Sequence, residues 1–159
     1  VQLSVSLLVK MAQSIPLQYF KIETSKTAEK LRALIAKGGD DIVGPFDGEG
    51  GITLMADLDA GATGTMPSAL IPDLIRRVVE AHRVGDREAA ARHYDRILPL
   101  INYENLQCGL GGTKFIMKEG GVIRSDHVRH PVAPLDPVLR TELLELTRQV
   151  EPLVLRWGL

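Results

Sequence analysis

The fold is decided by residues 17–66, LQYFKIETSKTAEKLRALIAKGGDDIVGPFDGEGGITLMADLDAGATGTM, in which short apolar segments alternate with stretches of helical periodicity. Residues 17–23 are rich in aromatic and β-branched residues, which favours a strand, and residues 41–46 and 60–66 are taken as the second and third strands. The periodic stretches predict helices at residues 28–39 and 52–58. This alternation of three short strands with two helices predicts an α/β fold with parallel strands and right-handed crossovers.

The first of these helices has clear start and stop signals. Thr27 is expected to cap its N-terminus, and Gly38-Gly39 is expected to end it. Its apolar stripe consists of Leu31, Leu34 and Ile35. The stretch DGEGG at residues 47–51 is read as a glycine-rich turn after the second strand.

The flanking sequence is helical in character. A helix over residues 4–14 is expected to bury a stripe of apolar side chains and to end before Pro16; the stripe is Leu7, Leu8, Met11 and Ile15. Beyond Pro67 we expect helices at residues 72–84 and 87–106, broken at Gly85-Asp86, and a short helix at residues 113–119. Asp136-Pro137 is a good helix start. The apolar face of that last helix is Leu139, Leu143, Leu146, Val150, Leu153 and Trp157.

Three parallel strands alone would form a narrow sheet with two unprotected edges, which isolated domains avoid. The economical solution is that upstream strands complete the sheet, and the opening at Val1, without a methionine, agrees with this. An eight-stranded barrel needs roughly 250 residues, so 159 residues correspond to about half of one.

Composition excludes several classes of protein. With 45% apolar and 25% charged residues, the chain is a globular protein and not a disordered one. The formal net charge of −1 gives no broad attraction to nucleic acid or to an anionic membrane. No apolar run is long enough for a membrane span. The single cysteine, Cys108, fits a reducing, cytoplasmic compartment, where we read it as a small packing residue.

Lys21 is the residue with the clearest chemical potential. Strand alternation places it on one face with Tyr19 and Glu23, near the carboxyl end of its strand. Spacing alone favours a structural role, such as an edge-strand lysine that discourages aggregation. The alternative is a desolvated amine that attacks a carbonyl group.

Three motifs in order, YFKIETS (19–25), GPFDGEGGITL (44–54) and AGATGTMPSALIPDLI (60–75), resemble the second half of the dihydrodipicolinate synthase and N-acetylneuraminate lyase superfamily. The version with GTMPSA is similar to the branch that includes keto-deoxy sugar acid dehydratases. The resemblance implies the C-terminal half of a (β/α)8 barrel. Residues 1–71 would supply strands six to eight, and residues 72–159 the last barrel helix and a helical extension.

The resemblance also implies class I Schiff-base chemistry with Lys21 as the lysine that condenses with pyruvate or another small 2-keto acid. That chemistry needs no metal and no organic cofactor, and the family implies a homo-oligomer, commonly a tetramer. A relay tyrosine and a pair of hydroxyl residues for the substrate carboxylate would precede Val1.

The implied substrate-binding residues are Glu23, Gly48, Glu49, Met66 and Ser68. Glu23 can also be interpreted as the ion-pair partner of a cation. The GEGG stretch can also be interpreted as an ordinary turn that needs positive φ values. In relatives, the residue matching Met66 offers its backbone carbonyl near the lysine, and the residue matching Ser68 touches the polar tail of the substrate. Pro67 departs from the commoner pattern. The histidines have no metal-ligand spacing and are read as solvated or core residues; they are His82, His93, His127 and His130.

The favoured function is therefore a Schiff-base lyase, aldolase or dehydratase, with keto-deoxy sugar acid dehydration preferred over dihydrodipicolinate formation. The alternative is a non-catalytic half-barrel that self-associates or docks on a partner through its strand edges. A regulator that binds a sugar acid without turnover is a third reading, against which the presence of Lys21 speaks.

Overall fold

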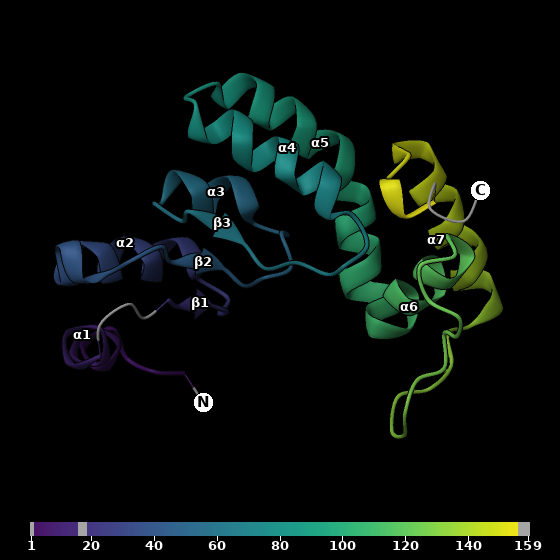
Figure 1. Ribbon diagram of the computed structural model, residues 1–159, viewed down its shortest axis with the longest axis horizontal. Helices are drawn as coiled ribbons and strands as arrows, with labels where there is room; N and C mark the ends of the chain where they lie inside the picture. The colour runs from purple at the N-terminus through teal and green to yellow at the C-terminus, as the bar shows by residue number, and fades with distance from the viewer. Residues whose placement is uncertain (1, 16–18, 156–159) are drawn as a thin grey trace. The chain divides into compact units, whose positions relative to one another are not determined.

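The computed structural model describes residues 2–15 and 19–155 of the chain (Figure 1). They form two compact units: residues 1–67 with 81–86, and residues 68–80 with 87–159. The first unit contains the sheet, and the second is helical.

The sheet of the first unit has three short parallel strands in the order β1 (Lys21–Ile22), β2 (Phe46–Asp47) and β3 (Gly64–Thr65). Lys21 is in register with Phe46, and Phe46 with Gly64. The pairing extends slightly beyond the strands, because the Phe46 N–H donates to the carbonyl of Phe20 at 2.8 Å. The predicted order of elements and their parallel pairing are confirmed.

The strands are shorter than expected. The second begins at Phe46 and not at Asp41, which lies in the 3-10 helix η1 (Gly39–Asp41). Gly44 has φ +50° and Pro45 has no N–H to donate, so the strand begins at Phe46, although the Pro45 carbonyl accepts the Thr63 N–H at 2.9 Å. At the third strand, Gly61 has φ +98° and closes the preceding helix, which excludes residues 60–61 from β3. Leu17 and Gln18, expected in the first strand, lie outside the described residues.

Three helices pack around this sheet: α1 (Val5–Ser14), α2 (Thr27–Gly38) and α3 (Leu54–Asp59). In α2, Leu31 and Leu34 are fully buried, as expected, and Gly39 ends the helix with φ +52°. The predicted cap was wrong by one residue. Thr27 is the first helical residue, and its hydroxyl donates to the carbonyl of Thr24 at 2.7 Å instead of accepting from the helix.

Leu34 tests how much of the stability of this unit comes from the packing of α2. We expect Leu34→Ala to lower the free energy of unfolding by about 3 kcal/mol, because it leaves a cavity at a site with no solvent exposure. Urea unfolding followed by circular dichroism measures it. Arg32→Ala, at an exposed position of the same helix, should change stability by less than about 0.5 kcal/mol. Equal losses from both substitutions would contradict the packing of α2.

The first helix buries only part of the expected stripe, with Leu8 buried and Met11 half-buried. Ser4 caps α1 by accepting from the Leu7 N–H, but the buried residues are Leu8, Val9 and Ala12. Leu7 and Ile15 are 44% and 53% exposed. Because α1 packs on α2, the buried surface of α1 is one narrow stripe, and the apolar residues beside that stripe remain exposed to solvent. Pro16 lies outside the described residues.

The helices that follow are α4 (Pro72–Arg83), α5 (Arg87–Tyr103), α6 (Gly109–Glu119) and α7 (Pro137–Val150). A π-helix, η2 (Glu104–Cys108), joins α5 to α6, and a 3-10 helix, η3 (Leu153–Leu155), follows α7. Gly85 has φ +85° and separates α4 from α5, as predicted. Helix α6 begins at Gly109, with φ +54°, and not at Thr113.

The start of α7 is as predicted, but its end is not. Asp136 accepts from the Val138 N–H at 2.8 Å, and Pro137 occupies the first turn. The helix ends at Val150 because Glu151 adopts φ +51° and Pro152 follows. Leu153 is therefore outside the helix and 43% exposed, and Trp157 lies outside the described residues.

The Asp136 cap provides a second stability test. We expect Asp136→Ala to lower the free energy of unfolding by about 1 kcal/mol, because the Val138 N–H loses its acceptor. Asp136→Asn keeps a side-chain oxygen at this position and should lose less than half as much. If the two substitutions cost the same in chemical unfolding, the hydrogen bond does not stabilise α7.

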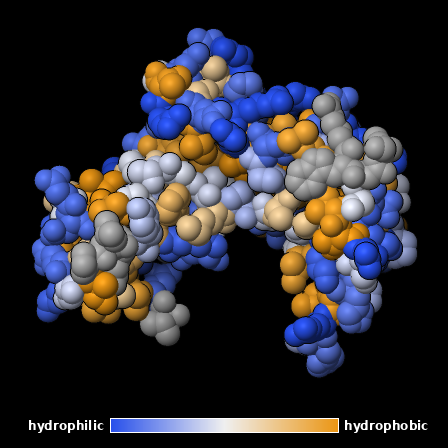
Figure 2. All heavy atoms as spheres, viewed as in Figure 1, coloured by the Kyte–Doolittle hydropathy of each residue, from blue (hydrophilic) through white to orange (hydrophobic). Residues whose placement is uncertain are grey.

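Apolar side chains also reach the surface in both units (Figure 2). Among the described residues, the most exposed large ones include Val84, Leu106, Leu110 and Val138. The described helices include none with the length and apolar character that crossing a membrane requires.

Candidate active site

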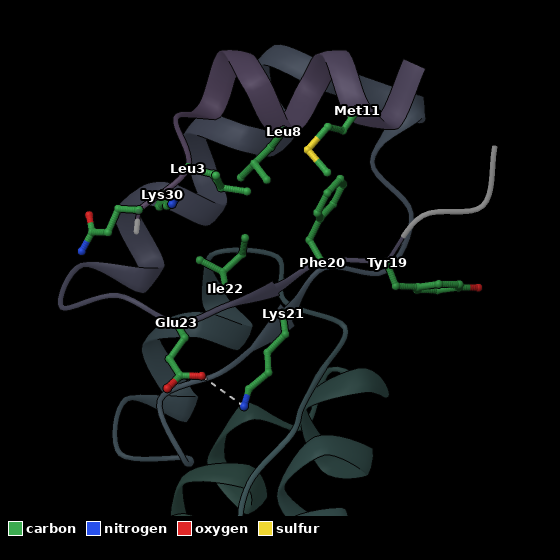
Figure 3. Close-up of a pocket in the computed structure, with 10 residues that line it drawn as sticks. Leu3, Leu8, Met11, Tyr19, Phe20, Lys21, Ile22, Glu23 and Lys30 are labelled. Carbon is green, nitrogen blue, oxygen red and sulfur yellow. Dashed lines mark ion pairs between the residues drawn. The ribbon is translucent and has the colours of Figure 1, made fainter. Parts of the chain in front are cut away.

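Lys21 and Glu23 project from the face of β1 opposite its buried residues. Phe20 and Ile22 are 8% and 4% exposed and point toward α1 (Figure 3). The alternation predicted for this segment is confirmed, since a strand sends successive side chains to opposite faces. The Lys21 side chain, on the first of the two residues of β1, is thereby held outside the core.

The Lys21 Nζ forms an ion pair with Glu23 Oε2 at 3.2 Å. The two side chains are 40% and 64% exposed, so both remain open to solvent. Of the two predicted roles of Glu23, pairing with a cation is the one seen here. A carboxylate at this distance from the amine is also a group to which a proton can be transferred.

A cavity of about 330 Å³ borders this strand. Its volume lies in the range of small-molecule sites. Its charged lining consists of Lys21, Glu23 and Lys30. Apolar and aromatic residues of α1 and β1 line the rest, among them Leu8, Met11, Tyr19 and Phe20 (Figure 3).

Gly48 lies directly against the Lys21 strand. A Cβ built at Gly48 would stand 2.8 Å from the carbonyl oxygen of Ile22 and 2.9 Å from Lys21 Cγ. No side chain fits there without displacing backbone, so glycine is required for space. The predicted turn with positive φ applies instead to Gly50 and Gly51, with φ of +66° and +88°.

The loop after β2 is tied down by Asp47, which is fully buried. Asp47 Oδ1 accepts the Glu49 N–H at 2.8 Å, and Oδ2 accepts the Thr65 hydroxyl at 2.6 Å. The Asp47 carbonyl accepts the Met66 N–H at 3.0 Å. Asp47 therefore links the candidate residues Glu49 and Met66 to the end of β2.

A second carboxyl group, Asp57 on α3, is also fully buried in this unit. Its Oδ2 accepts the Thr53 hydroxyl at 2.6 Å. Burial raises the pKa of Asp57 to about 6, the Thr53 hydrogen bond opposes this, and Asp47 and Glu49 add to the rise. Sequence reasoning missed both aspartates, because Asp47 was read as the start of a turn and Asp57 as a polar residue of a helix.

The remaining predicted residues divide between the units. Met66 belongs to the first, and its side chain is 46% exposed. Ser68 belongs to the second, where its hydroxyl accepts the Leu70 N–H at 3.3 Å and contacts Glu104. The structure thus brings together five of the six predicted residues in one unit: Lys21, Glu23, Gly48, Glu49 and Met66.

Cys108 and His82, the other titratable candidates, have surroundings that favour a structural role. Burial, followed by the charges of Glu104 and Glu142, raises the pKa of Cys108 to about 11, so its thiol stays protonated near neutral pH. His82 Nε2 lies 3.0 Å from Asp59 Oδ1. Within residues 2–15 and 19–155, no three His, Cys, Asp or Glu side chains are grouped to hold a metal ion.

Comparison with known proteins agrees with this architecture. The model of the dihydrodipicolinate synthetase family matches residues 18–150. The chain is 53% identical over 157 residues to the L-2-keto-3-deoxyarabonate dehydratase of Azospirillum brasilense, covering 98% of this chain and 51% of that one.

Solved structures give the same result. A dihydrodipicolinate synthase from Rhodopseudomonas palustris is 27% identical with a TM-score of 0.82, over 92% of this chain and 50% of that one. The Escherichia coli K12 prophage protein YagE, solved in complex with pyruvate, shares the fold at 23% identity, with a TM-score of 0.76 over 95% of this chain and 52% of that one.

The chain spans about half the length of the relatives it matches. Three parallel β/α units over that span confirm the predicted part of a (β/α)8 barrel. The family resemblance of the three motifs is likewise confirmed, and the chain belongs to the dihydrodipicolinate synthetase family.

Proposed function

We propose that the protein to which this chain belongs is a class I Schiff-base lyase that dehydrates a 2-keto-3-deoxy sugar acid, with Lys21 as the nucleophile. The observation that carries the proposal is the position of Lys21 on β1, beside a cavity and 3.2 Å from a carboxylate. The 53% identity to a keto-deoxy sugar acid dehydratase supports this substrate class.

The chemistry begins with the unprotonated amine of Lys21. Nζ adds to the C2 carbonyl of the keto acid, and the resulting carbinolamine loses water to give an iminium ion. The positive nitrogen makes a C3 proton acidic, and loss of that proton to a base gives an enamine. The enamine electron pair then expels the C4 hydroxyl, which leaves as water after protonation. Hydrolysis of the iminium returns the free lysine.

The neighbouring residues have distinct roles in this proposal. Glu23 accepts the proton that Lys21 must lose before it attacks. Gly48 leaves room for the lysine stem, and the Glu49 and Met66 segments contact the substrate from the ends of β2 and β3. The protein acts as a homo-oligomer and takes a small 2-keto acid as its partner.

A second candidate function is the synthase reaction, in which the same iminium forms with pyruvate and then makes a carbon–carbon bond. The similarity to solved dihydrodipicolinate synthases favours it. Both reactions share the first step, so the keto acid that reacts with Lys21 separates them.

Borohydride trapping tests the proposal directly. The folded chain is treated with pyruvate or with a 2-keto-3-deoxy pentonate, reduced, digested and mapped by mass spectrometry. We expect a reduced adduct on Lys21, formed more readily with the sugar acid. A preference for pyruvate would favour the synthase reaction. An adduct on another lysine would overturn the role of Lys21, and no adduct would favour the non-catalytic half-barrel for this chain.

Glu23 can be tested in the same assay. We expect Glu23→Gln to slow adduct formation by about 10²-fold at neutral pH, because the amide cannot accept the lysine proton. Glu29→Gln is the matched control, since Glu29 pairs with Lys26 on the exposed face of α2. Equal rates for Glu23→Gln and the unsubstituted chain would show that the ion pair has no part in the attack.

A further inference from the structure

Asp47 and Asp57 are two carboxyl groups with no solvent exposure in the same unit. Asp47 ends β2, and Asp57 lies in the middle of α3, which packs against β2. Two ionised carboxylates enclosed together are costly, and such pairs hold a proton between them. The question is which of the two carries it.

The hydrogen bonds around the pair answer this. Both side-chain oxygens of Asp47 already accept, from the Glu49 N–H and from the Thr65 hydroxyl. Asp57 accepts only from the Thr53 hydroxyl, through Oδ2. Its Oδ1 is buried and has no hydrogen-bond partner among the described residues. An oxygen that lacks a donor can be satisfied by becoming one.

We propose that Asp47 is a positioning residue for the candidate active site, and that a proton on Asp57 Oδ1 is donated to the Asp47 carboxylate and holds it in place. In this arrangement Asp57 is the neutral member of the pair. Asp47 in turn fixes the Glu49 backbone and Thr65, the neighbour of Met66. The positioning role rests on the proposed function, because Glu49 and Met66 matter only if that site binds substrate.

The surroundings make the pair sensitive to pH. The charged groups that act on Asp57 are Asp47 and Glu49, both negative. Helix α2, which also packs against α3, buries the apolar Leu31 and Leu34. On α3 itself, Asp59 is paired with His82. Loss of the Asp57 proton therefore places two negative charges together in the core. This weakens the hold of Asp47 on the loop that follows β2.

Carbon-13 NMR of the aspartate carboxyl groups tests the pair without any assay of activity. The pKa of Asp57 is raised to about 6, so we expect one aspartate to titrate with a midpoint near that value. Asp57→Asn should remove this transition, and Asp47→Asn should move its midpoint downward. Asp59→Asn, two residues further along α3, is the control and should leave it in place. A midpoint below 5 in the unsubstituted chain would overturn the shared proton.

Borohydride trapping with pyruvate then tests positioning. We expect Asp47→Asn to raise the half-saturating pyruvate concentration about 10-fold, because one of the two donors loses its acceptor, while the rate at saturation changes less. In the unsubstituted chain, the half-saturating concentration should rise above pH 6, where Asp57 loses its proton. In Asp57→Asn, the amide donates permanently to Asp47, so this rise should disappear.

The outcomes separate the two claims. If Asp47→Asn and Asp59→Asn behave alike in trapping, Asp47 does not position the site. If Lys21 forms no adduct in the unsubstituted chain, the proposed function and the positioning role fail together. The carboxyl titration still decides whether the aspartates share a proton.

Discussion

Replacing Lys21 by arginine is expected to abolish the borohydride-dependent adduct with a 2-keto acid, lowering its yield by more than about 10³-fold. Arginine keeps the positive charge and the pairing with Glu23, but its guanidinium does not lose a proton at accessible pH and cannot form the imine. The variant therefore removes the chemistry and leaves the electrostatics of β1 largely in place. Intact-mass measurement after reduction reports the yield.

Lys30 provides the matched control for this substitution. It lines the same cavity as Lys21 but lies on α2, away from the end of the strand. Lys30→Arg should retain the adduct. If Lys30→Arg loses the adduct and Lys21→Arg keeps it, the nucleophile has been assigned to the wrong lysine of this cavity.

The second large effect concerns stability. Asp57 is buried, and its pKa of about 6 lies above the ordinary aspartate value near 4. A folded-state pKa above the unfolded value means that the native state binds the proton more tightly. The resulting stabilisation is complete below about pH 4 and is lost as pH rises through about 6. This group alone should lower the free energy of unfolding by about 3 kcal/mol between those values.

Asp57→Asn should remove that pH dependence and make the chain more stable than the unsubstituted form at pH 7. Its amide oxygen can accept from Thr53 and its NH₂ can donate to Asp47, as the protonated acid does. Urea unfolding at pH 4, 5, 6 and 7 measures the difference between the two proteins. Asp40→Asn, at an exposed position of the same unit, should run parallel to the unsubstituted chain, and an Asp57→Asn curve parallel to it as well would contradict the raised pKa.

The sequence predicted the order of elements because that order depends on local signals. Periodicity located α2, and Asp136 with Pro137 located the start of α7. The strand limits depended on backbone conformation at Gly44 and Gly61, which periodicity does not contain. The buried face of α1 depended on where α2 packs, so Leu7 was assigned to the wrong side.

The candidate site was likewise predictable only where it depends on local sequence. Alternation within one strand was enough to place Lys21 and Glu23 on a common face. The burial of Asp47 and Asp57 arises from the meeting of β2 with α3, so no stretch of sequence around either residue predicts it. A carboxylate that follows an apolar residue at a strand end, with hydroxyl residues nearby in the fold, would be the pattern to look for.

Gly48 limits where the loop after β2 can be varied. A Cβ at residue 48 would stand within 3 Å of the Ile22 carbonyl oxygen and of Lys21 Cγ, so any side chain there would displace Lys21 together with the loop. Glu49 already carries a side chain, and its backbone N–H is anchored by Asp47. A library that varies the Glu49 side chain and keeps Gly48 would change what the loop presents to a ligand while the lysine stays where it is.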